Sequence, residues 1–519
     1  MKTRIVMLVM GVFLCATQAF AQQGTVTGKV TDEQGVPLVS VSVIIKGTTL
    51  GTATNEAGEY TVRAAPGQVL QFRRIGAIPV ERTVGADNTI NVQLQRSVTA
   101  LNTVVVTALG ETAAQRSLGT AQQTVTGAAV AQTQRENFVN ALQGRVAGVQ
   151  VVSTSGVPGA SSSITIRGVS SISSSNQPLM IVDGLPMDNK TLNTAVLAAD
   201  APGSVTAFNN RGLDFTNRAA DLNPNDIETM TVLKGPEAAA LYGIDAANGV
   251  IVITTKRGSA GGGFQYDNSL RIESTRARPG IQQVYGPSGV GASTFLYFGA
   301  PYPAGTPLYD NVAGFFRTAK TQKHNLSFSG ATPDNRINYR LSTGITKQEG
   351  VIPGSDYRRV NLTGASQGQV TNWLNADLSM AYSYNNNDQV FKGDGGPLLG
   401  LLVWPSFDNA SDWLTPAGTR RRLTTLAAGS EVDNPYFNIS KNKINAKNNR
   451  LIANLGVTLT PFSWSSFKTI LGTDNYTNQN LVLRHPESTY GFSNGGVLDV
   501  ADDITRNLNM QNLLNFNSR

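Results

Sequence analysis

The second half of the chain contains eight runs in which apolar and polar residues alternate. The runs span residues 264–272, 326–328, 337–345, 360–362, 374–382, 451–459, 467–476 and 504–516. A period of two places successive side chains on opposite faces of a strand. The connections between the runs are alternately short and long, as in membrane barrels, where short turns lie at one end and long loops at the other. The pattern therefore predicts eight antiparallel strands of a transmembrane β-barrel.

Composition favours such a barrel over membrane helices. Only 15% of the residues are charged, 52 are glycine, and the mean hydropathy is -0.13. Lipid-facing and lumen-facing residues alternate in a barrel, so their hydropathies cancel. After the first 21 residues the chain has no uninterrupted apolar run of about 20 residues, the length that a membrane helix needs. The net charge of +7 over 519 residues is too small to indicate a nucleic-acid partner.

The first 21 residues have the pattern of a signal peptide. Lys2 and Arg4 form a basic region, residues 5–14 are apolar, and Ala19–Ala21 provide small residues for cleavage. A lipoprotein leader is the alternative, but large residues precede Cys15, which favours ordinary cleavage. Cys15 is the only cysteine, so we expect a mature chain without a thiol or a disulfide.

Residues 22–97 predict a small β-sandwich. Short alternating runs occur at residues 26–30, 41–46, 58–63, 69–73 and 89–94. Turn residues such as Asn55–Gly58 and Pro66–Gly67 separate them. Regularly spaced short strands of this kind are typical of two packed sheets.

Residues 223–258 predict a strand, a helix and a second strand. The strands are expected at 229–233 and 249–255, and the helix at 237–242, where Gly243 can end it. Upstream we expect a short helix at 137–144, strands at 149–153 and 163–167, and a loop at 191–218. The region from 115 to 260 is therefore a mixed α+β domain.

Several motifs of this domain resemble the plug of TonB-linked outer-membrane receptors, in the form found in the SusC/RagA family. They are Asn223–Glu228 (NPNDIE), Val232–Pro236 (VLKGP), Ala239–Gly243 (AALYG), Ala246–Ile251 (AANGVI), Ile164–Gly168 (ITIRG) and Pro178–Gly184 (PLMIVDG). The candidate site residues taken from these motifs are Arg167, Gly168, Asp183, Gly184, Lys234, Gly235, Tyr242, Gly243, Asn248 and Gly249. Arg167 and Asp183 could hold or release the plug inside a barrel, or they could be ion pairs within the plug. An unrelated α/β module that shares a few glycines is the alternative.

The front domain is similar to the carboxypeptidase-regulatory-like domain found at the start of many SusC/RagA proteins. The matching motifs are Gly28–Asp32 (GKVTD), Gly35–Leu38 (GVPL), Gly47–Thr49 (GTT) and Thr54–Tyr60 (TNEAGEY). The resemblance does not imply peptidase activity. A zinc peptidase needs histidine and carboxylate ligands at suitable spacing, and the two histidines, His324 and His485, lie far outside this domain. We therefore expect no catalytic residue, no metal and no cofactor.

A β-branched segment lies between these two domains, in the linker of residues 98–114. It resembles the TonB box of the family and comprises Thr103, Val104, Val105, Val106, Thr107 and Ala108. Such a segment can pair as a strand with the sheet edge of another protein. An acidic pair is more usual where Asn102 and Thr103 stand, which leaves the register open. An ordinary linker strand is the alternative.

The predicted order is a signal peptide (1–21), a β-sandwich (22–97), a TonB box with linker (98–114), a plug (115–260) and a partial barrel (261–519). The fold class is mainly β with an α+β plug. A plugged transporter has about 22 strands, whereas this chain has eight. We therefore expect an N-terminal portion of a longer protein, whose last strand is an edge that must pair with something.

The longest predicted outer loop is rich in aromatic and basic residues. Trp404, Phe407, Trp413 and Tyr436 could stack on sugar rings, but burial against a protein partner is favoured because exposed aromatics are costly. The basic runs 420–422 and 441–450 are interpreted as a solvated face rather than a site for anionic lipopolysaccharide or substrate.

The resemblance implies a TonB-dependent importer in the Gram-negative outer membrane, surrounded by lipid. In the family, a SusD-like lipoprotein covers the outer loops, oligosaccharides or peptides are the substrates, and TonB, energised by ExbB and ExbD, pulls on the TonB box. A siderophore or cobalamin receptor is an alternative, disfavoured by the front sandwich and the NPNDIE motif. An envelope signalling or adhesion protein is another. An enzyme is disfavoured because no phosphate-binding loop, Cys/His cluster or nucleophile elbow is present.

Overall fold

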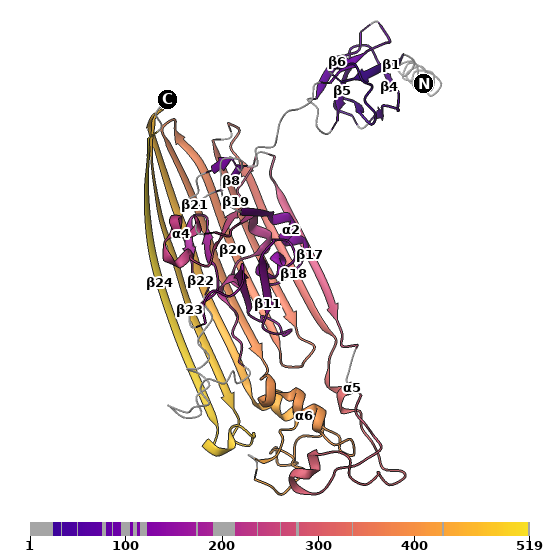
Figure 1. Ribbon diagram of the computed structural model, residues 1–519, viewed down its shortest axis with the longest axis vertical. Coiled ribbons are helices and arrows are strands. Elements are labelled where there is room, and N and C mark those ends of the chain that lie inside the picture. The colour runs from indigo at the N-terminus through magenta and orange to yellow at the C-terminus, as the bar shows by residue number, and fades with distance from the viewer. Residues whose placement is uncertain are drawn as a thin grey trace, which may run out of the picture. The chain divides into compact units, whose positions relative to one another are not determined.

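The computed structural model describes two compact units (Figure 1). The described residues are 24–516 without 33, 49, 75–78, 86, 95–103, 107–111, 115–121, 173–174, 190–212, 236, 260, 277–279, 335 and 428–429. The predicted signal peptide and most of the predicted loop at 191–218 lie outside them. No helix among the described residues combines the length and the apolar character that crossing a membrane requires.

The front unit is the predicted β-sandwich. Its strands are β1 (Gly24–Thr31), β2 (Ser42–Ile45), β3 (Gly51–Ala53), β4 (Glu59–Ala64), β5 (Val69–Arg73), β6 (Val80–Thr83) and β7 (Val92–Gln93). One sheet has the order β4-β1-β7 and the other β3-β2-β5-β6. Alternate residues of both sheets, such as Val26, Val43 and Leu70, share one core, in which Tyr60 meets Phe72 edge to face at 5.3 Å. Strands β3 and β6 were not predicted, because they are short and mostly polar.

The plug is built on a five-stranded sheet with the order β10-β15-β16-β13-β14, beside the hairpin β11-β12. Its elements are β10 (Gln122–Thr126), α2 (Gly127–Gln132), η4 (Phe138–Leu142), β11 (Val149–Ser153), β12 (Ser162–Ile166), β13 (Leu179–Val182), β14 (Leu185–Met187), η6 (Arg218–Asp221), η7 (Pro224–Asp226), β15 (Ile227–Leu233), α4 (Glu237–Tyr242), η8 (Ile244–Ala246) and β16 (Val250–Thr255). The predicted strand, helix and strand are confirmed as β15, α4 and β16. The predicted helix at 137–144 is the shorter 3-10 helix η4.

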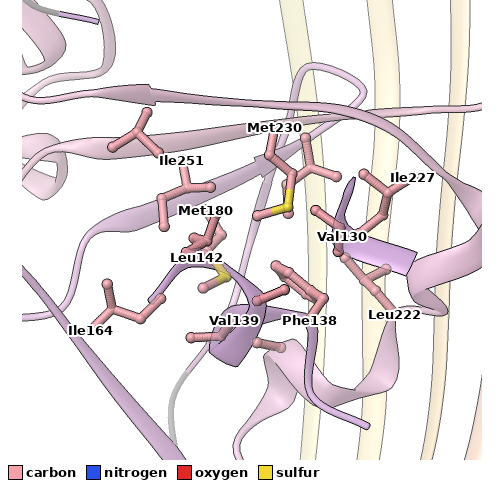
Figure 2. Packing of buried hydrophobic residues seen from close by; sticks show 14 of the residues in the cluster. Val130, Phe138, Val139, Leu142, Ile164, Met180, Leu222, Ile227, Met230 and Ile251 are labelled. Atoms are coloured by element: carbon pink, nitrogen blue, oxygen red, sulfur yellow. The ribbon is translucent and has the colours of Figure 1, made fainter. Parts of the chain in front are cut away.

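The plug has an apolar core of its own (Figure 2). Phe138 and Leu142 of η4 pack with Met180, Met230 and Ile251 from three strands of the sheet. All but one of the buried residues in this cluster belong to the plug, the exception being Ile452. Burial of this size gives each large side chain about 1.5–3 kcal/mol. The plug therefore does not depend on the larger sheet for most of its apolar burial.

The larger sheet has eight antiparallel strands, each paired with its neighbours in sequence. They are β17 (Phe264–Glu273), β18 (Ala319–Ala331), β19 (Ile337–Glu349), β20 (Asp356–Thr371), β21 (Leu374–Gln389), β22 (Lys443–Phe462), β23 (Ser465–Arg484) and β24 (Val497–Phe516). All eight predicted strands are confirmed, and most are longer than predicted. The basic run 441–450 was wrongly placed in a loop, since residues 443–450 begin β22.

The connections of this sheet follow the predicted alternation. Residues 332–336, 372–373 and 463–464 connect strands at one end, and residues 274–318, 350–355, 390–442 and 485–496 at the other. The connection at 350–355 is only slightly longer than the turn at 332–336. The long connections contain η9 (Gly291–Phe295), α5 (Asn311–Phe315), η10 (Gly393–Gly395), α6 (Pro397–Val403), α7 (Pro435–Lys441) and η12 (Phe492–Asn494).

An aromatic row lies on the outer face of the sheet, near the short turns. Phe264 contacts Phe328 at 4.6 Å between ring centroids, and Trp464 lies 5.3 Å from Phe462 and 6.0 Å from Phe516. Aromatic rings are enriched at the two membrane interfaces of outer-membrane barrels. The row therefore marks one boundary of the lipid-facing band.

Gly127 is expected to be essential for the plug. A Cβ atom added there would lie 1.8 Å from the carbonyl oxygen of Ile227, so α2 would have to move away from β15. We expect Gly127→Ala to lower the free energy of unfolding of the plug by about 1–3 kcal/mol, the usual cost of overpacking. Limited proteolysis of the folded full-length protein should then cut within residues 122–258. Gly156→Ala is the control, because nothing lies within 4 Å of its added Cβ. Equal resistance of the two variants would contradict this account.

Candidate functional site

The plug contacts the inner face of the larger sheet mainly through polar side chains. Figure 1 shows the plug elements lying along the strands of this sheet. Arginine, asparagine and aspartate side chains occupy many inward-facing strand positions and are buried there. Buried polar groups require hydrogen-bond partners, and many of these groups find them on the plug.

Arg450 of β22 forms the densest of these contacts. Its side chain is 1% exposed and donates to both carboxylate oxygens of Asp474, at 2.8 and 2.6 Å. It also donates to the carboxylate of Asp221 at 3.2 Å and to the carbonyl oxygens of Arg218 at 3.0 Å and Asp188 at 2.9 Å. One guanidinium therefore binds two separate segments of the plug and a neighbouring strand.

Asp226 of η7 forms a second contact, and it lies inside the NPNDIE motif. Its Oδ1 accepts hydrogen bonds from Ser342 at 2.5 Å and Arg340 at 3.2 Å, both on β19. Its Oδ2 accepts from Thr363 of β20 at 2.9 Å and from Asn223 at 2.9 Å. The carboxylate is therefore satisfied by groups on both sides of the interface.

Glu136 forms a third contact. Its carboxylate lies 3.1 Å from Arg271 of β17 and 3.3 Å from Lys323 of β18. Burial opposes ionisation of Glu136, but these two cations outweigh it and hold the pKa of the carboxyl below its ordinary value. A fourth contact joins Asp214 to Lys392, at 2.9 Å. The interface therefore contains carboxylates of the plug paired with cations of the sheet and its connections.

Asp183 and Gly184 lie at this interface as the turn between β13 and β14. Both have positive φ, 48° and 87°, as a two-residue hairpin turn requires. The carboxylate of Asp183 accepts from Thr255 and lies 3.5 Å from Arg257. Its carbonyl oxygen accepts from Asn454 of β22 at 2.5 Å. Asp183 thus has both alternatives at once, an ion pair within the plug region and a contact with the sheet.

Arg167 and Gly168 form another turn within the plug, with φ of 60° and 93°. Burial and the nearby charge of Arg167 lower the pKa of Lys234, whose Nζ donates to Gln123 at 3.1 Å. The backbone of Arg167 donates to the carbonyl oxygen of Gly148. The described contacts of these residues hold the plug's own fold together.

The remaining motif residues surround α4. Gly235 is buried before the helix, and Tyr242 packs on the cluster that includes Ala238. Gly243, with φ of 77°, ends α4 by donating to the carbonyl oxygen of Ala239.

Asn248 and Gly249 of the AANGVI motif directly precede β16, and Gly249 lies against β12. Asn248 accepts from Ser170 at 2.6 Å and donates to Ser175 at 2.8 Å. A Cβ on Gly249 would lie 2.9 Å from Ile166. Asn248 therefore acts through hydrogen bonds, and Gly249 through close packing and its positive φ of 92°.

The segment predicted as a TonB box is partly described. Val104–Val106 form β8, which pairs with β9 (Thr112–Ala114) in a two-stranded sheet. Thr103, Thr107 and Ala108 lie outside the described residues. The backbone of β8 is therefore extended, as strand pairing with a partner requires.

Two of the four loop aromatics, Trp404 and Tyr436, pack within the protein rather than waiting for a partner. Trp404 is 2% exposed, contacts Phe295 at 5.6 Å and donates to Asp408. Tyr436 packs edge to face on Phe315, at 5.2 Å. Trp404 is thus buried, and Tyr436 partly buried, against a different long connection. Trp404 therefore does not need a partner to cover it.

The other two aromatics are more open. Trp413 is half-buried against Phe437, whereas Phe407 is 38% exposed. Of the four, Phe407 alone therefore offers an exposed ring.

The basic run 420–422 is not the solvated face that was predicted. The side chain of Arg420 is 0% exposed and lies 2.9 Å from Asp433. Arg421 pairs with Asp408 at 2.6 Å, and Arg422 pairs with Glu431 at 2.9 Å. These arginines stabilise the loop from within, because they pair with carboxylates 9 to 13 residues away in the same connection.

Sequence reasoning missed the charged residues at the interface. Arg450 was assigned to a basic loop, and Asp474, Asp221 and Glu136 were not singled out. A charged residue at the inward phase of an alternating strand is a usable signal, and it would have found Asp474. The plug partners have no such local signal.

Glu136→Gln is expected to destabilise the protein at neutral pH, by about 1–3 kcal/mol for the loss of a charged partner. The pKa of Glu136 is lowered in the folded state, so its contribution is present above the unfolded pKa and is lost as pH falls through the folded value. Denaturant midpoints of the full-length protein should differ between wild type and variant at pH 7, and the difference should be smaller at pH 3, below the ordinary pKa of a glutamate. An equal difference at both pH values would contradict the ion-pair account.

Two known domain families match the chain. Residues 114–250 match the TonB-dependent Receptor Plug Domain, and residues 26–106 match the CarboxypepD_reg-like domain. The chain is 34% identical over 359 residues to the TonB-dependent receptor SusC of Bacteroides thetaiotaomicron, an alignment of 68% of this chain and 33% of SusC. It is 28% identical over 516 residues to the TonB-dependent receptor P26 of Formosa agariphila, covering 97% of this chain and 48% of that receptor. The chain thus spans between a third and about half of these relatives.

The fold is similar to that of a solved structure of the RagAB peptide transporter. The TM-score is 0.54 at 23% identity, over 75% of this chain and 45% of that one. This likeness concerns the fold alone. The relatives are receptors and transporters rather than enzymes. By its plug, its front domain and its likeness to SusC, the chain belongs to the SusC/RagA family of TonB-dependent receptors, outer-membrane β-barrel proteins whose plug faces the periplasm.

Proposed function

We propose that the full-length protein imports oligosaccharides or peptides across the outer membrane, driven by TonB. The observation that carries this proposal is the difference between the two kinds of packing around the plug. Its main apolar core is almost entirely its own, whereas most of its contacts with the sheet are hydrogen bonds and ion pairs such as Arg450 with Asp221. A smaller apolar cluster, in which Leu213 and Phe215 meet Ile444 and Val482, is the exception. Polar contacts can be exchanged for water, but an apolar core cannot be opened without a large loss of burial. Such a plug can leave its seat while it keeps much of its own fold.

In this proposal TonB binds to the segment that precedes the plug. Strand β8 (Val104–Val106) pairs with β9 on one side, and a strand has a second edge that an added strand of TonB can take. Main-chain hydrogen bonds along a strand share a pulling force. The outer membrane has no ATP, so work must arrive mechanically from the inner membrane through TonB, ExbB and ExbD.

A polar cavity of about 380 Å³ beside the plug is the proposed contact for substrate. Asn137, Asn140, Ser153 and Ser155 of the plug line it, and Tyr357 lines it from the sheet. Hydroxyl and amide groups of this kind hydrogen-bond both sugar hydroxyls and peptide groups. The cavity also includes Gly350, which belongs to the end of the sheet with the long connections. These connections are the proposed seat of a SusD-like lipoprotein.

Uptake of labelled oligosaccharides and peptides by cells that express the full-length protein tests the proposal. One class of substrate should accumulate, and collapse of the inner-membrane proton gradient should stop accumulation while surface binding persists. Growth on ferric siderophore or cobalamin as the limiting nutrient should not depend on the protein. Accumulation that continues without the gradient, or surface binding with no uptake in either condition, would refute TonB-driven import.

A further inference from the structure

Arg359 is a buried cation that forms no ion pair with a carboxylate among the described residues. It belongs to β20, is 2% exposed, and its Nη1 donates to the carbonyl oxygens of Glu136 and Ala220. Its Nε has no hydrogen-bond partner among the described residues. The nearby carboxylates serve other cations, as Glu136 pairs with Lys323 and Asp226 with Arg340. Carbonyl oxygens solvate part of the guanidinium, but they do not neutralise it.

A small cavity of about 20 Å³ borders Arg359 between the plug and the sheet. Lys323 of β18 and Arg135 of the plug also line it, together with the neutral side chains of Thr346 and Asn361. No aspartate or glutamate is among its lining residues in the described part of the chain. A cavity of this size has room for one occupant of about the size of a water molecule. The charged side chains of its walls are therefore all cations, and its amide and hydroxyl groups can donate hydrogen bonds to such an occupant.

We propose that a small monovalent anion such as chloride binds in this cavity, held by Arg359 and Lys323. An isolated buried charge is strongly unfavourable unless a counter-charge lies close to it. A water molecule would supply an acceptor for Nε but no negative charge. The cavity is too small for the carboxylate of a substrate with its attached chain. The anion would therefore join β18 and β20 to residues 134–136 of the plug, and it is part of the interface rather than a transported molecule.

Thermal unfolding of the purified full-length protein in detergent tests this site. At constant ionic strength, chloride or bromide should raise the midpoint by roughly 2 °C over gluconate, which is too large for the cavity. Arg359→Gln should abolish the difference between the anions. Arg358→Gln is the matched control, because it removes the same charge one residue away on the exposed face of β20, and it should keep the difference. Crystals grown in bromide should show an anomalous peak beside Arg359.

Two results would overturn the proposal. One is a wild-type midpoint that does not depend on the anion, or a dependence that survives Arg359→Gln. The other is bromide that occupies other positions while the cavity beside Arg359 contains none. If Arg359→Gln fails to fold, the position of bromide in the wild-type protein decides alone. None of these measurements depends on transport, so failure of the proposed function would leave them unaffected.

Discussion

Deletion of residues 103–108 from the full-length protein is expected to abolish substrate uptake and to leave substrate binding at the cell surface unchanged. The deletion removes β8 (Val104–Val106), the strand that we propose TonB pairs with. Without this strand TonB cannot transmit force to the plug. The contacts between plug and sheet, such as those of Arg450, therefore stay formed. Uptake of the labelled substrate should fall to the level of cells that lack the gene. Surface binding should persist, because the plug and the long connections are unchanged.

A pair of point variants separates strand pairing from general damage. Val105→Pro removes a backbone N–H and is poorly tolerated in a paired strand, so uptake should fall as in the deletion. Val105→Thr keeps a β-branched residue of similar size and should transport normally. Full uptake by the deletion variant would exclude this segment as the coupling strand. Normal uptake by Val105→Pro would exclude strand pairing as the means of coupling.

Arg450→Met is expected to loosen the plug in its seat. The change leaves Asp474, which is 0% exposed, and Asp221, which is 2% exposed, without their shared cation. Removal of one partner from a buried pair costs about 3–5 kcal/mol, because the remaining charge is uncompensated. We expect a lower denaturant midpoint for the full-length protein, and a leak of small solutes across the outer membrane in the absence of TonB.

Two further variants test whether the buried contact itself is responsible for that result. Lys447→Met is the control, since it removes a positive charge from the same strand on its exposed face. It should change neither stability nor leak. Adding Asp474→Asn to Arg450→Met should restore part of the lost stability, because it removes a buried charge that has no partner. A loss in Lys447→Met equal to that in Arg450→Met would show that strand charge in general, and not the buried contact, is responsible.

The lengths of the strands show where sequence patterns stop being informative. Alternation in β22 is clear only from residue 451 to 459, yet the strand begins at Lys443. Lys443, Asn445 and Lys447 take the positions that would face lipid. A strand of 20 residues is about 66 Å long, whereas the apolar band of an outer-membrane barrel is only about 25 Å tall. The extra length continues beyond the lipid, where the outward positions are polar and the apolar residues Ile444 and Ala446 face inward. The lipid-facing alternation that marks residues 451–459 therefore does not extend to Lys443.

The plug illustrates the same division at the level of single residues. The motif residues Gly243 and Gly249 could be identified from the sequence because positive φ restricts a position to few residue types. Glu136 and Arg359 could not, since their roles depend on segments more than 100 residues away that meet them only in the folded protein. The prediction that a protein partner buries the loop aromatics was wrong for Trp404 for a related reason. Trp404 is covered by Phe295 from another long connection, and residue composition does not tell which surface covers a ring.

The sequence by itself determined the kinds of element and their order: a β-sandwich, an extended segment, an α+β plug and a sheet of alternating strands. Each of these follows from local preference, because periodicity, turn residues and glycines act over a few neighbouring positions. The tertiary structure alone decided which charges meet across the interface of plug and sheet. A buried ion pair such as that of Arg450 and Asp221 depends on distance in space, and the register of eight strands against the plug is fixed only when the whole assembly packs.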